Sequence, residues 1–323
     1  MKKLITISII GMLSIMLVNN PLTDRYVNGL KVINIPASGQ KNALYMEIEE
    51  IAKEYEKPAQ DAKVDPVWKA IPGYNGLKVD ISASYAKMKK DGKFDESKLV
   101  YIQTTPAVHL KDLPPTAIYK GHPDKPMVSF IINVAWGNEY LGSILETLKK
   151  NNVHASFFLE GRWVKENPEL AKMIVEAGHE VGNHSYTHPD MKQISSAKIR
   201  EEIVKTNEVI KATTGEEVVW LAPPSGSYRE EVVKIAAEYK LGTVMWSVDT
   251  IDWQKPSPEQ LINRVMGKVH KGAMILMHPT DSTAKALDEL IKRIKLEKYE
   301  INTVSELLSE ERIMKKSVLN VQE

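Results

Sequence analysis

The chain has 323 residues, of which 43% are hydrophobic and 26% are charged, a globular composition long enough for about two domains. With 43 basic and 42 acidic residues the formal net charge is +1, so nothing indicates a nucleic-acid surface. The chain contains no cysteine, which excludes disulfides, thiolate metal ligands and the lipidated cysteine of a bacterial lipoprotein. Any bound metal must therefore be held by His, Asp, Glu or water.

Residues 1–24 have the pattern of a secretory signal, with two lysines followed by an apolar run over residues 4–18. The run is short for a membrane span, which needs about 20 residues. No A-x-A-like cleavage site follows it, since Asn19 and Asn20 come next. Cleaved export is favoured over an uncleaved N-terminal anchor, and both stay open. We therefore expect a secreted or membrane-anchored, extracytoplasmic protein that meets the membrane only through an uncleaved N-terminal segment.

Residues 25–115 predict a small α/β domain of unknown role. Residues 42–57 have apolar residues at helical spacing, residues 76–92 indicate a strand followed by a helix, and residues 98–105 indicate another strand. No cluster of potential ligands or nucleophiles occurs in this region. Residues 116–126 concentrate Pro and Gly and predict a linker. Beyond it we expect one domain over residues 127–312 and a polar tail over residues 313–323.

Residues 127–312 alternate between short β-branched or aromatic runs and amphipathic helical stretches. Repeated strand–helix units predict a parallel sheet. A distorted or incomplete (β/α) barrel is favoured over an open doubly wound sheet, because no Gly-rich dinucleotide loop is present. The predicted strands are residues 127–135, 155–161, 179–184, 218–224, 243–249 and 273–279, and the predicted helices are 139–150, 162–177, 196–213, 230–240, 258–270 and 283–296.

Polar residues follow the predicted strands at the carboxyl edge, where such barrels place their sites: Asn133, His184, Pro223, Asp249 and His278. Within "GNHSYTHP", His184 and His188 are four residues apart, and neutral imidazoles are good ligands for zinc or cobalt. A catalytic zinc site needs a third protein ligand and an open position for water. Two structural histidines held by hydrogen bonds are the alternative.

Three motifs in this order resemble those of the polysaccharide deacetylase family, the family 4 carbohydrate esterases that share the chitooligosaccharide deacetylase fold. They are "HSYTH" from His184 to His188, "VDTIDW" at residues 248–253 and "ILMH" ending at His278. The resemblance implies hydrolysis of acetamido C–N bonds in peptidoglycan or another N-acetylglucosamine polymer, with a divalent metal. It also suggests the sporulation and cell-wall branch of Gram-positive bacteria.

Two further motifs of the family are altered. Where the family has T-F-D-D-G-P, this chain has Asn133 in place of the first aspartate, the general base, and Val134 in place of the second, the third metal ligand. Where the family has R-P-P-Y-G, this chain has "APPSG", with Ala222 in place of the arginine that orients the base and Ser225 in place of the tyrosine.

The remaining roles that the resemblance implies fall on residues that match the family. Asp249 would hold His278, the general acid, although such a carboxylate–imidazole pair is also a common structural feature. Trp253 and Leu276 would wall the acetyl pocket. Pro223 is a further candidate for binding substrate. Apart from the resemblance, Tyr228 could stack on a sugar ring through its apolar face, although aromatic residues also mark packing.

These departures predict a protein that is inactive or very weakly active. A carboxamide at Asn133 takes no proton from water near neutral pH, and loss of a positioned base typically costs about 10² to 10⁴ in rate. Val134 offers no lone pair, so divalent metal would bind weakly or not at all. Two alternatives stay open. One is an active metal-dependent deacetylase with a rearranged site, in which the amide oxygen of Asn133 is a ligand and Asp190 or Glu139 supplies the acid. The other is a non-catalytic protein that binds the cell wall through its N-terminal domain.

Overall fold

The computed structural model describes residues 42–314 of the chain. The predicted signal peptide or anchor, and most of the predicted polar tail, lie outside the described residues. Within them, no helix is long and apolar enough to cross a membrane. The described residues form two compact units, the smaller with residues 42–56 and 78–102 and the larger with residues 57–77 and 103–314. The predicted domain boundaries stay a prediction, since a compact unit need not fold as an independent domain.

The smaller unit packs two helices against each other. Helix α3 (Ala43–Tyr55) begins where the Asn42 side chain accepts a hydrogen bond from the Leu44 amide, and α4 (Ile81–Met88) is capped by Asp80 in the same way. Leu44, Ile48 and Met88 are buried between them. The strands β3 (Gly76–Val79) and β4 (Tyr101–Thr104), each of which has two residues in this unit and two in the larger one, pair with each other, and a 3₁₀ turn, η1 (Glu96–Lys98), precedes β4. The predicted helix and strands of this region are therefore present.

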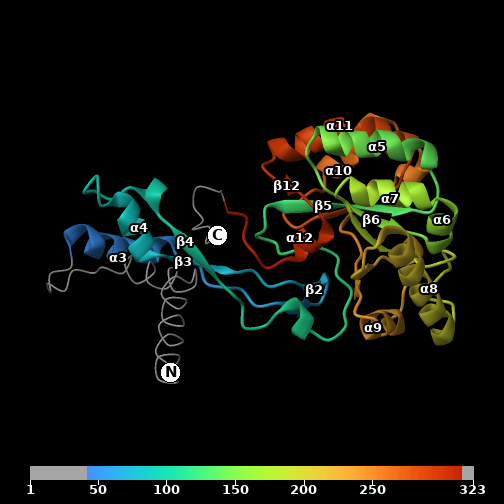
Figure 1. The fold of residues 1–323 in the computed structure, drawn as a ribbon, viewed down its shortest axis with the longest axis horizontal. Helices are drawn as coiled ribbons and strands as arrows, with labels where there is room; N and C mark the ends of the chain where they lie inside the picture. The colour runs from blue at the N-terminus through green and yellow to red at the C-terminus, as the bar shows by residue number, and fades with distance from the viewer. Residues whose placement is uncertain (1–41, 315–323) are drawn as a thin grey trace, which may run out of the picture. The chain divides into compact units, whose positions relative to one another are not determined.

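The larger unit contains a parallel sheet of eight strands, which confirms the predicted incomplete barrel. Its order is β10-β11-β5-β6-β7-β8-β9, with β12 also paired to β5, and each of these pairs is parallel. Figure 1 shows the helices arranged around these strands. The strands are β5 (Met127–Val134), β6 (Ser156–Leu159), β7 (Glu180–Asn183), β8 (Trp220–Leu221), β9 (Gly242–Thr243), β10 (Val248–Asp249), β11 (Met274–Met277) and β12 (Glu300–Ile301).

The helices follow the strands nearly as predicted. One difference is the predicted helix over residues 162–177, which is two helices that meet at Asn167, because Pro168 disfavours the helical conformation in the residue before it. The helices are α5 (Asn138–Lys150), α6 (Gly161–Glu166), α7 (Pro168–Glu176), α8 (Ser196–Thr214), α9 (Glu230–Glu238), α10 (Pro258–Met266), α11 (Asp281–Leu296) and α12 (Val304–Leu308). Before the barrel lie an antiparallel hairpin, β1 (Lys63–Asp65) with β2 (Lys69–Ile71), and the turn η2 (Leu110–Asp112); η3 (Pro224–Gly226) and η4 (Asp252–Gln254) follow strands.

The barrel is open between β9 and β10, although these strands are consecutive in the chain. The predicted strand 243–249 is accordingly two short strands that pair with opposite edges of the sheet. Beside the break, the Ile118 amide donates to the carbonyl of Thr243, and the Ile118 carbonyl accepts from the Met245 amide. The Gly121 amide donates to the carbonyl of Gly272 near the start of β11. The segment over residues 118–121 thus satisfies backbone groups that a closed barrel would pair with a strand.

Strand β5 shows how the sheet separates two cores. All eight of its residues are buried, and successive side chains point to opposite faces. Val128, Phe130, Ile132 and Val134 pack with the helices outside the barrel, whereas Ile131 belongs to the inner cluster that includes Phe158 and Leu276 of neighbouring strands. Asn133 has the inward orientation at the carboxyl end of the strand, where the inner core gives way to a cavity.

Candidate functional site

A cavity of about 420 Å³ lies at the carboxyl ends of the barrel strands. Most of the sequence-predicted site residues line it, together with three tryptophans from different loops. The lining residues are Asn133, Ala135, Trp136, His184, His188, Ser225, Trp246, Asp249, Trp253, Leu276 and His278.

Asn133 lies near the carboxyl end of β5 and is one of the residues that line this cavity. The residue is 4% exposed, and its Oδ1 atom is buried without a hydrogen-bond partner. A buried acceptor left unpaired costs about 1–3 kcal/mol. Such a group is typical of a functional site, where a ligand supplies the missing donor. A neutral amide is not a base at neutral pH, so the residue can orient a ligand but cannot take a proton from water.

His184 is held in one neutral tautomer. Its ring is 2% exposed, and Nδ1 lies 2.7 Å from the carbonyl oxygen of Ala222. A carbonyl only accepts, so Nδ1 carries the hydrogen and Nε2 keeps its lone pair. Burial lowers the pKa of His184 from 6.5 to about 3, so the ring is uncharged at neutral pH. Ala222 therefore contributes its backbone to the site, while its methyl side chain packs in the inner core where the family's motif has arginine.

His188 is brought beside His184 by a tight loop with two left-handed residues, Ser185 at φ 62° and His188 at φ 56°. The Asn183 side chain accepts from the Ser185 amide at 2.8 Å, and the Ser185 hydroxyl accepts from the His188 amide at 3.1 Å. The two imidazole centroids are 5.0 Å apart and the rings are edge to face. Partial burial also lowers the pKa of His188, so both rings are present as neutral donors of a lone pair.

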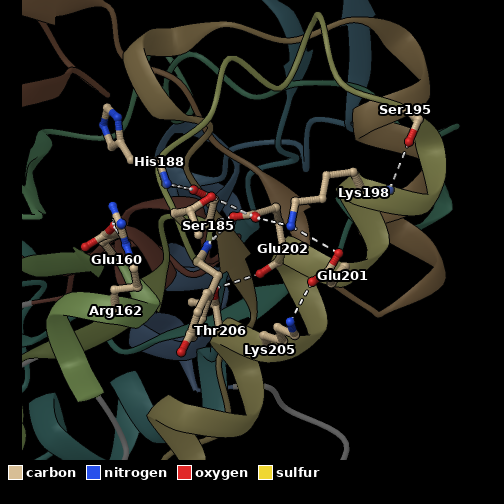
Figure 2. A network of polar contacts seen from close by, with 12 residues as sticks. Glu160, Arg162, Ser185, His188, Ser195, Lys198, Glu201, Glu202, Lys205 and Thr206 are labelled. Atoms are coloured by element: carbon tan, nitrogen blue, oxygen red, sulfur yellow. Dashed lines mark hydrogen bonds and ion pairs between the residues drawn. The ribbon is translucent and has the colours of Figure 1, made fainter. Parts of the chain in front are cut away.

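Glu202 of α8 accepts hydrogen bonds from the loop that carries His184 and His188. Its role was not predicted from the sequence. Its carboxylate is 1% exposed and accepts from the amides of Tyr186 at 2.8 Å and Thr187 at 2.7 Å, as well as from the Thr187 hydroxyl. Lys198, one turn earlier, forms an ion pair with it, and Figure 2 shows how the network continues to Glu201 at the surface. One signal was available in the sequence. Glu202 lies on the apolar side of an amphipathic helix, and a buried glutamate is seldom found without a partner.

His278 is paired with Asp252, which corrects the predicted pairing with Asp249. His278 Nδ1 lies 2.8 Å from Oδ1 of Asp252, whose carboxylate is fully buried and also accepts from the His278 amide and the Thr283 hydroxyl. The reason is the turn after β10, where Ile251 is left-handed at φ 53° and directs Asp252 beneath the imidazole. Asp249 lines the cavity instead and accepts from the Ile251 amide at 2.8 Å.

Of the residues predicted to contact sugar, Trp253 and Leu276 line the cavity. The Trp253 side chain is 55% exposed, whereas Leu276 is buried in the inner core. Pro223 and Tyr228 are not among the described residues of the lining. The Tyr228 hydroxyl lies 2.9 Å from that of Tyr119, so its phenol is occupied by another contact. Their predicted role in binding sugar stays a prediction.

Trp136 is an additional wall of the cavity. Its indole stacks on the His278 imidazole, with centroids 5.9 Å apart and planes inclined by 10°. The next residue, Gly137, has φ 85°, and a Cβ there would lie 2.0 Å from the carbonyl oxygen of Pro279. Only glycine permits this approach, which fixes the loop carrying Trp136 against the segment after His278.

The donors present do not fit a catalytic zinc centre. Within residues 42–314, no group of three or more His, Asp or Glu side chains is placed to hold a metal. His184 and His188 supply two nitrogen ligands, but Val134 is 1% exposed and packs in the outer core. The amide oxygen of Asn133 is an uncharged donor, whereas catalytic zinc sites take their third ligand from His, Glu, Asp or Cys. We therefore derive no chemical step through a metal.

Sequence comparison shows that the chain is similar to polysaccharide deacetylases. The family model for polysaccharide deacetylase matches residues 120–244. Peptidoglycan-N-acetylmuramic acid deacetylase PdaA of Bacillus subtilis is 31% identical over 199 residues, which cover 60% of this chain and 76% of PdaA. The uncharacterized protein YlxY of Bacillus subtilis is 55% identical over 299 residues, which cover 93% of this chain and 94% of YlxY.

Among solved structures, the chain is similar to BA3943 of Bacillus anthracis, which is described as a CE4 family pseudoenzyme. The identity is 58%, the match covers 85% of this chain and 97% of that one, and the TM-score is 0.81. A BA3943 mutant described as having restored enzymatic activity is 57% identical, covers 84% of this chain and 99% of its own, and has a TM-score of 0.80. The order of the motifs, the half-barrel and these relatives show that the chain belongs to the polysaccharide deacetylase family.

Proposed function

We propose that the protein is a non-hydrolysing member of its family that binds an N-acetylglucosamine polymer such as peptidoglycan outside the cytoplasm. The observation that carries this proposal is Asn133, a buried amide with an unpartnered oxygen, at a position that the sequence resemblance assigns to the general base. The cavity is retained, with tryptophans at its wall, while the base and the charged third metal ligand are absent from it. The peptidoglycan deacetylases among its relatives, and the description of BA3943 as a pseudoenzyme, support the proposal.

The proposal includes weak binding of a divalent metal. The Nε2 lone pair of His184 and the imidazole of His188 offer two ligands, and the Asn133 oxygen offers an uncharged third. Zinc or cobalt held by this set would dissociate readily, and its bound water would keep a pKa well above the ~7 of a catalytic zinc centre. Titration calorimetry of the full chain with zinc chloride measures this affinity.

No observation favours the alternative of a rearranged hydrolase. Asp190 is exposed, and its Oδ1 accepts from the Ser227 hydroxyl and the Lys192 amide. Glu139 is exposed in the first turn of α5. Neither carboxylate is among the described residues that line the cavity.

Binding without hydrolysis is tested by two measurements on one sample. With N-acetylglucosamine tetramer, we expect measurable binding by calorimetry and no release of acetate over the same period with added zinc or cobalt. Trp253→Ala removes an exposed indole at the cavity wall and should weaken binding about tenfold, because stacking of this kind contributes ~1 kcal/mol beyond the buried area. Tyr239→Ala, which removes an exposed aromatic ring at the end of α9, is the matched control. Absence of binding would overturn the proposal.

A further inference from the structure

The cavity lining includes hydrogen-bond acceptors on Asn133, His184 and Asp249. Asn133 Oδ1 is buried without a partner, and His184 Nε2 keeps a lone pair because Nδ1 donates to Ala222. Asp249 adds a carboxylate at the end of β10, for which the described residues supply one hydrogen bond, from the Ile251 amide. A ligand that pairs with these acceptors must bring hydrogen-bond donors.

The charges of the lining residues also favour a cationic ligand. Asp249 is a negative group on the wall, and no lysine or arginine occurs among the described residues that line the cavity. His278 contacts the Asp252 carboxylate, so a charge on this imidazole would be compensated within the pair. At position 222, where the resembled motif carries arginine, Ala222 leaves no cation.

Three tryptophans line the cavity, and the faces of their rings can attract a cation. Trp136 is 48% exposed, with one face against His278, and Trp253 is 55% exposed. Trp246, from the segment between β9 and β10, also lines the cavity. Indole rings pack on the apolar faces of sugar rings and also attract ammonium groups, by about 0.5–2 kcal/mol.

We propose that the cavity selects an amino sugar whose 2-amino group is free and protonated, so that the protein binds de-N-acetylated stretches of an amino-sugar polymer in preference to acetylated ones. An ammonium group supplies three donors and a positive charge, which match the unpartnered acceptors and Asp249. An acetamido group supplies one donor, no charge and an added carbonyl acceptor. This inference rests on the proposed function, because it names which form of the sugar the non-hydrolysing site takes.

The test compares two probes, glucosamine tetramer and N-acetylglucosamine tetramer, on the full chain treated with EDTA at pH 6. Calorimetry should show the amino tetramer binding at least about tenfold more tightly, which corresponds to one charge-assisted contact. Asp249→Asn should bring this ratio close to one. Glu139→Gln removes the same charge from an exposed position outside the lining and should leave the ratio intact.

A second measurement needs no variant. The preference of the wild-type chain should disappear above about pH 9, where the sugar amine is deprotonated. Equal affinities, a preference for the acetylated tetramer, or the same loss of ratio with Glu139→Gln would overturn the inference and leave the proposed function standing. Failure of both tetramers to bind would overturn the proposed function itself.

Discussion

The Nδ1 atom of His278 lies 2.8 Å from Oδ1 of Asp252, a carboxylate with no exposed surface. The same carboxylate accepts the His278 amide and the Thr283 hydroxyl, so it joins the end of β11 to the start of α11. A buried charge is tolerated only with such a complete set of partners. The pair that could serve as a general acid in an active relative therefore also has a structural role in this chain.

Asp252→Asn should lower the free energy of unfolding by about 1–3 kcal/mol, because it replaces charge-assisted hydrogen bonds to a buried group. Asp249→Asn is the matched control, since Asp249 is partly exposed and accepts one backbone amide, and its effect should stay below ~1 kcal/mol. Urea denaturation followed by circular dichroism measures both. Equal destabilisation by the two variants would contradict the assignment of Asp252 as the partner of His278.

Glu202→Gln should destabilise the loop that carries the two histidines. The substitution weakens acceptors for the Tyr186 and Thr187 amides and leaves Lys198 without its buried partner. We expect a loss of about 1–3 kcal/mol in unfolding free energy. Glu201→Gln, on the same helix but at the surface, breaks exposed ion pairs and should cost less than ~1 kcal/mol. Urea denaturation distinguishes the two, and similar losses would contradict the role of Glu202.

Gly137→Ala should be strongly destabilising, by more than ~2 kcal/mol, because its Cβ would overlap the Pro279 carbonyl and its φ is positive. The comparison is Gly142→Ala in α5, where a Cβ meets nothing within 4 Å and the helix should gain up to ~1 kcal/mol. Thermal denaturation should shift in opposite directions for the two variants. A tolerated Gly137→Ala would contradict the close approach that positions Trp136.

Stability should fall as the pH is lowered below about 6.5, the ordinary pKa of histidine. Burial lowers the pKa of His122 and His179 to about 4 and that of His184 to about 3. The unfolded chain therefore binds protons that the folded chain does not, and stability decreases as the pH falls from about 6.5 towards these values. Each such histidine contributes a slope of about 1.4 kcal/mol per pH unit in this window.

His184→Asn tests this slope at one residue. The amide can still donate to the Ala222 carbonyl but does not titrate. Urea unfolding between pH 6 and pH 4.5 should show a slope smaller by about 1.4 kcal/mol per pH unit than in the wild-type chain. An unchanged slope would mean that His184 is not held neutral by burial.

The alternation of strands and helices allowed the half-barrel to be predicted, because inward and outward residues of a parallel sheet are both apolar and the connecting helices are amphipathic. The barrel was predicted to be incomplete, but the position of its opening, between β9 and β10, was not predicted. Residues 243–249 form a largely apolar run. Such a run is equally compatible with one continuous strand and with two short strands at opposite edges of the sheet. The break at Asn167 follows from Pro168 and was available from the sequence.

The cavity residues were predicted through spacing and resemblance, and the structure brings Asn133, His184, His188 and His278 together at its wall. The predicted pairing of His278 with Asp249 was wrong, and the partner is Asp252, three residues further along the chain. A left-handed turn at Ile251 decides between them, and a β-branched residue gives no signal of that conformation. Glu202 was missed because its partners are backbone amides, which a sequence does not display.

The measurement that tests the central claim most directly is release of acetate from N-acetylglucosamine oligomers by the wild-type chain and by Asn133→Asp, each with saturating zinc or cobalt. The account predicts no release above the protein-free reaction for the wild-type chain. It predicts a rise for Asn133→Asp, which puts a carboxylate at the cavity wall, because a positioned base typically contributes about 10² to 10⁴ in rate. Release by the wild-type chain at the rate of an intact family member would contradict it.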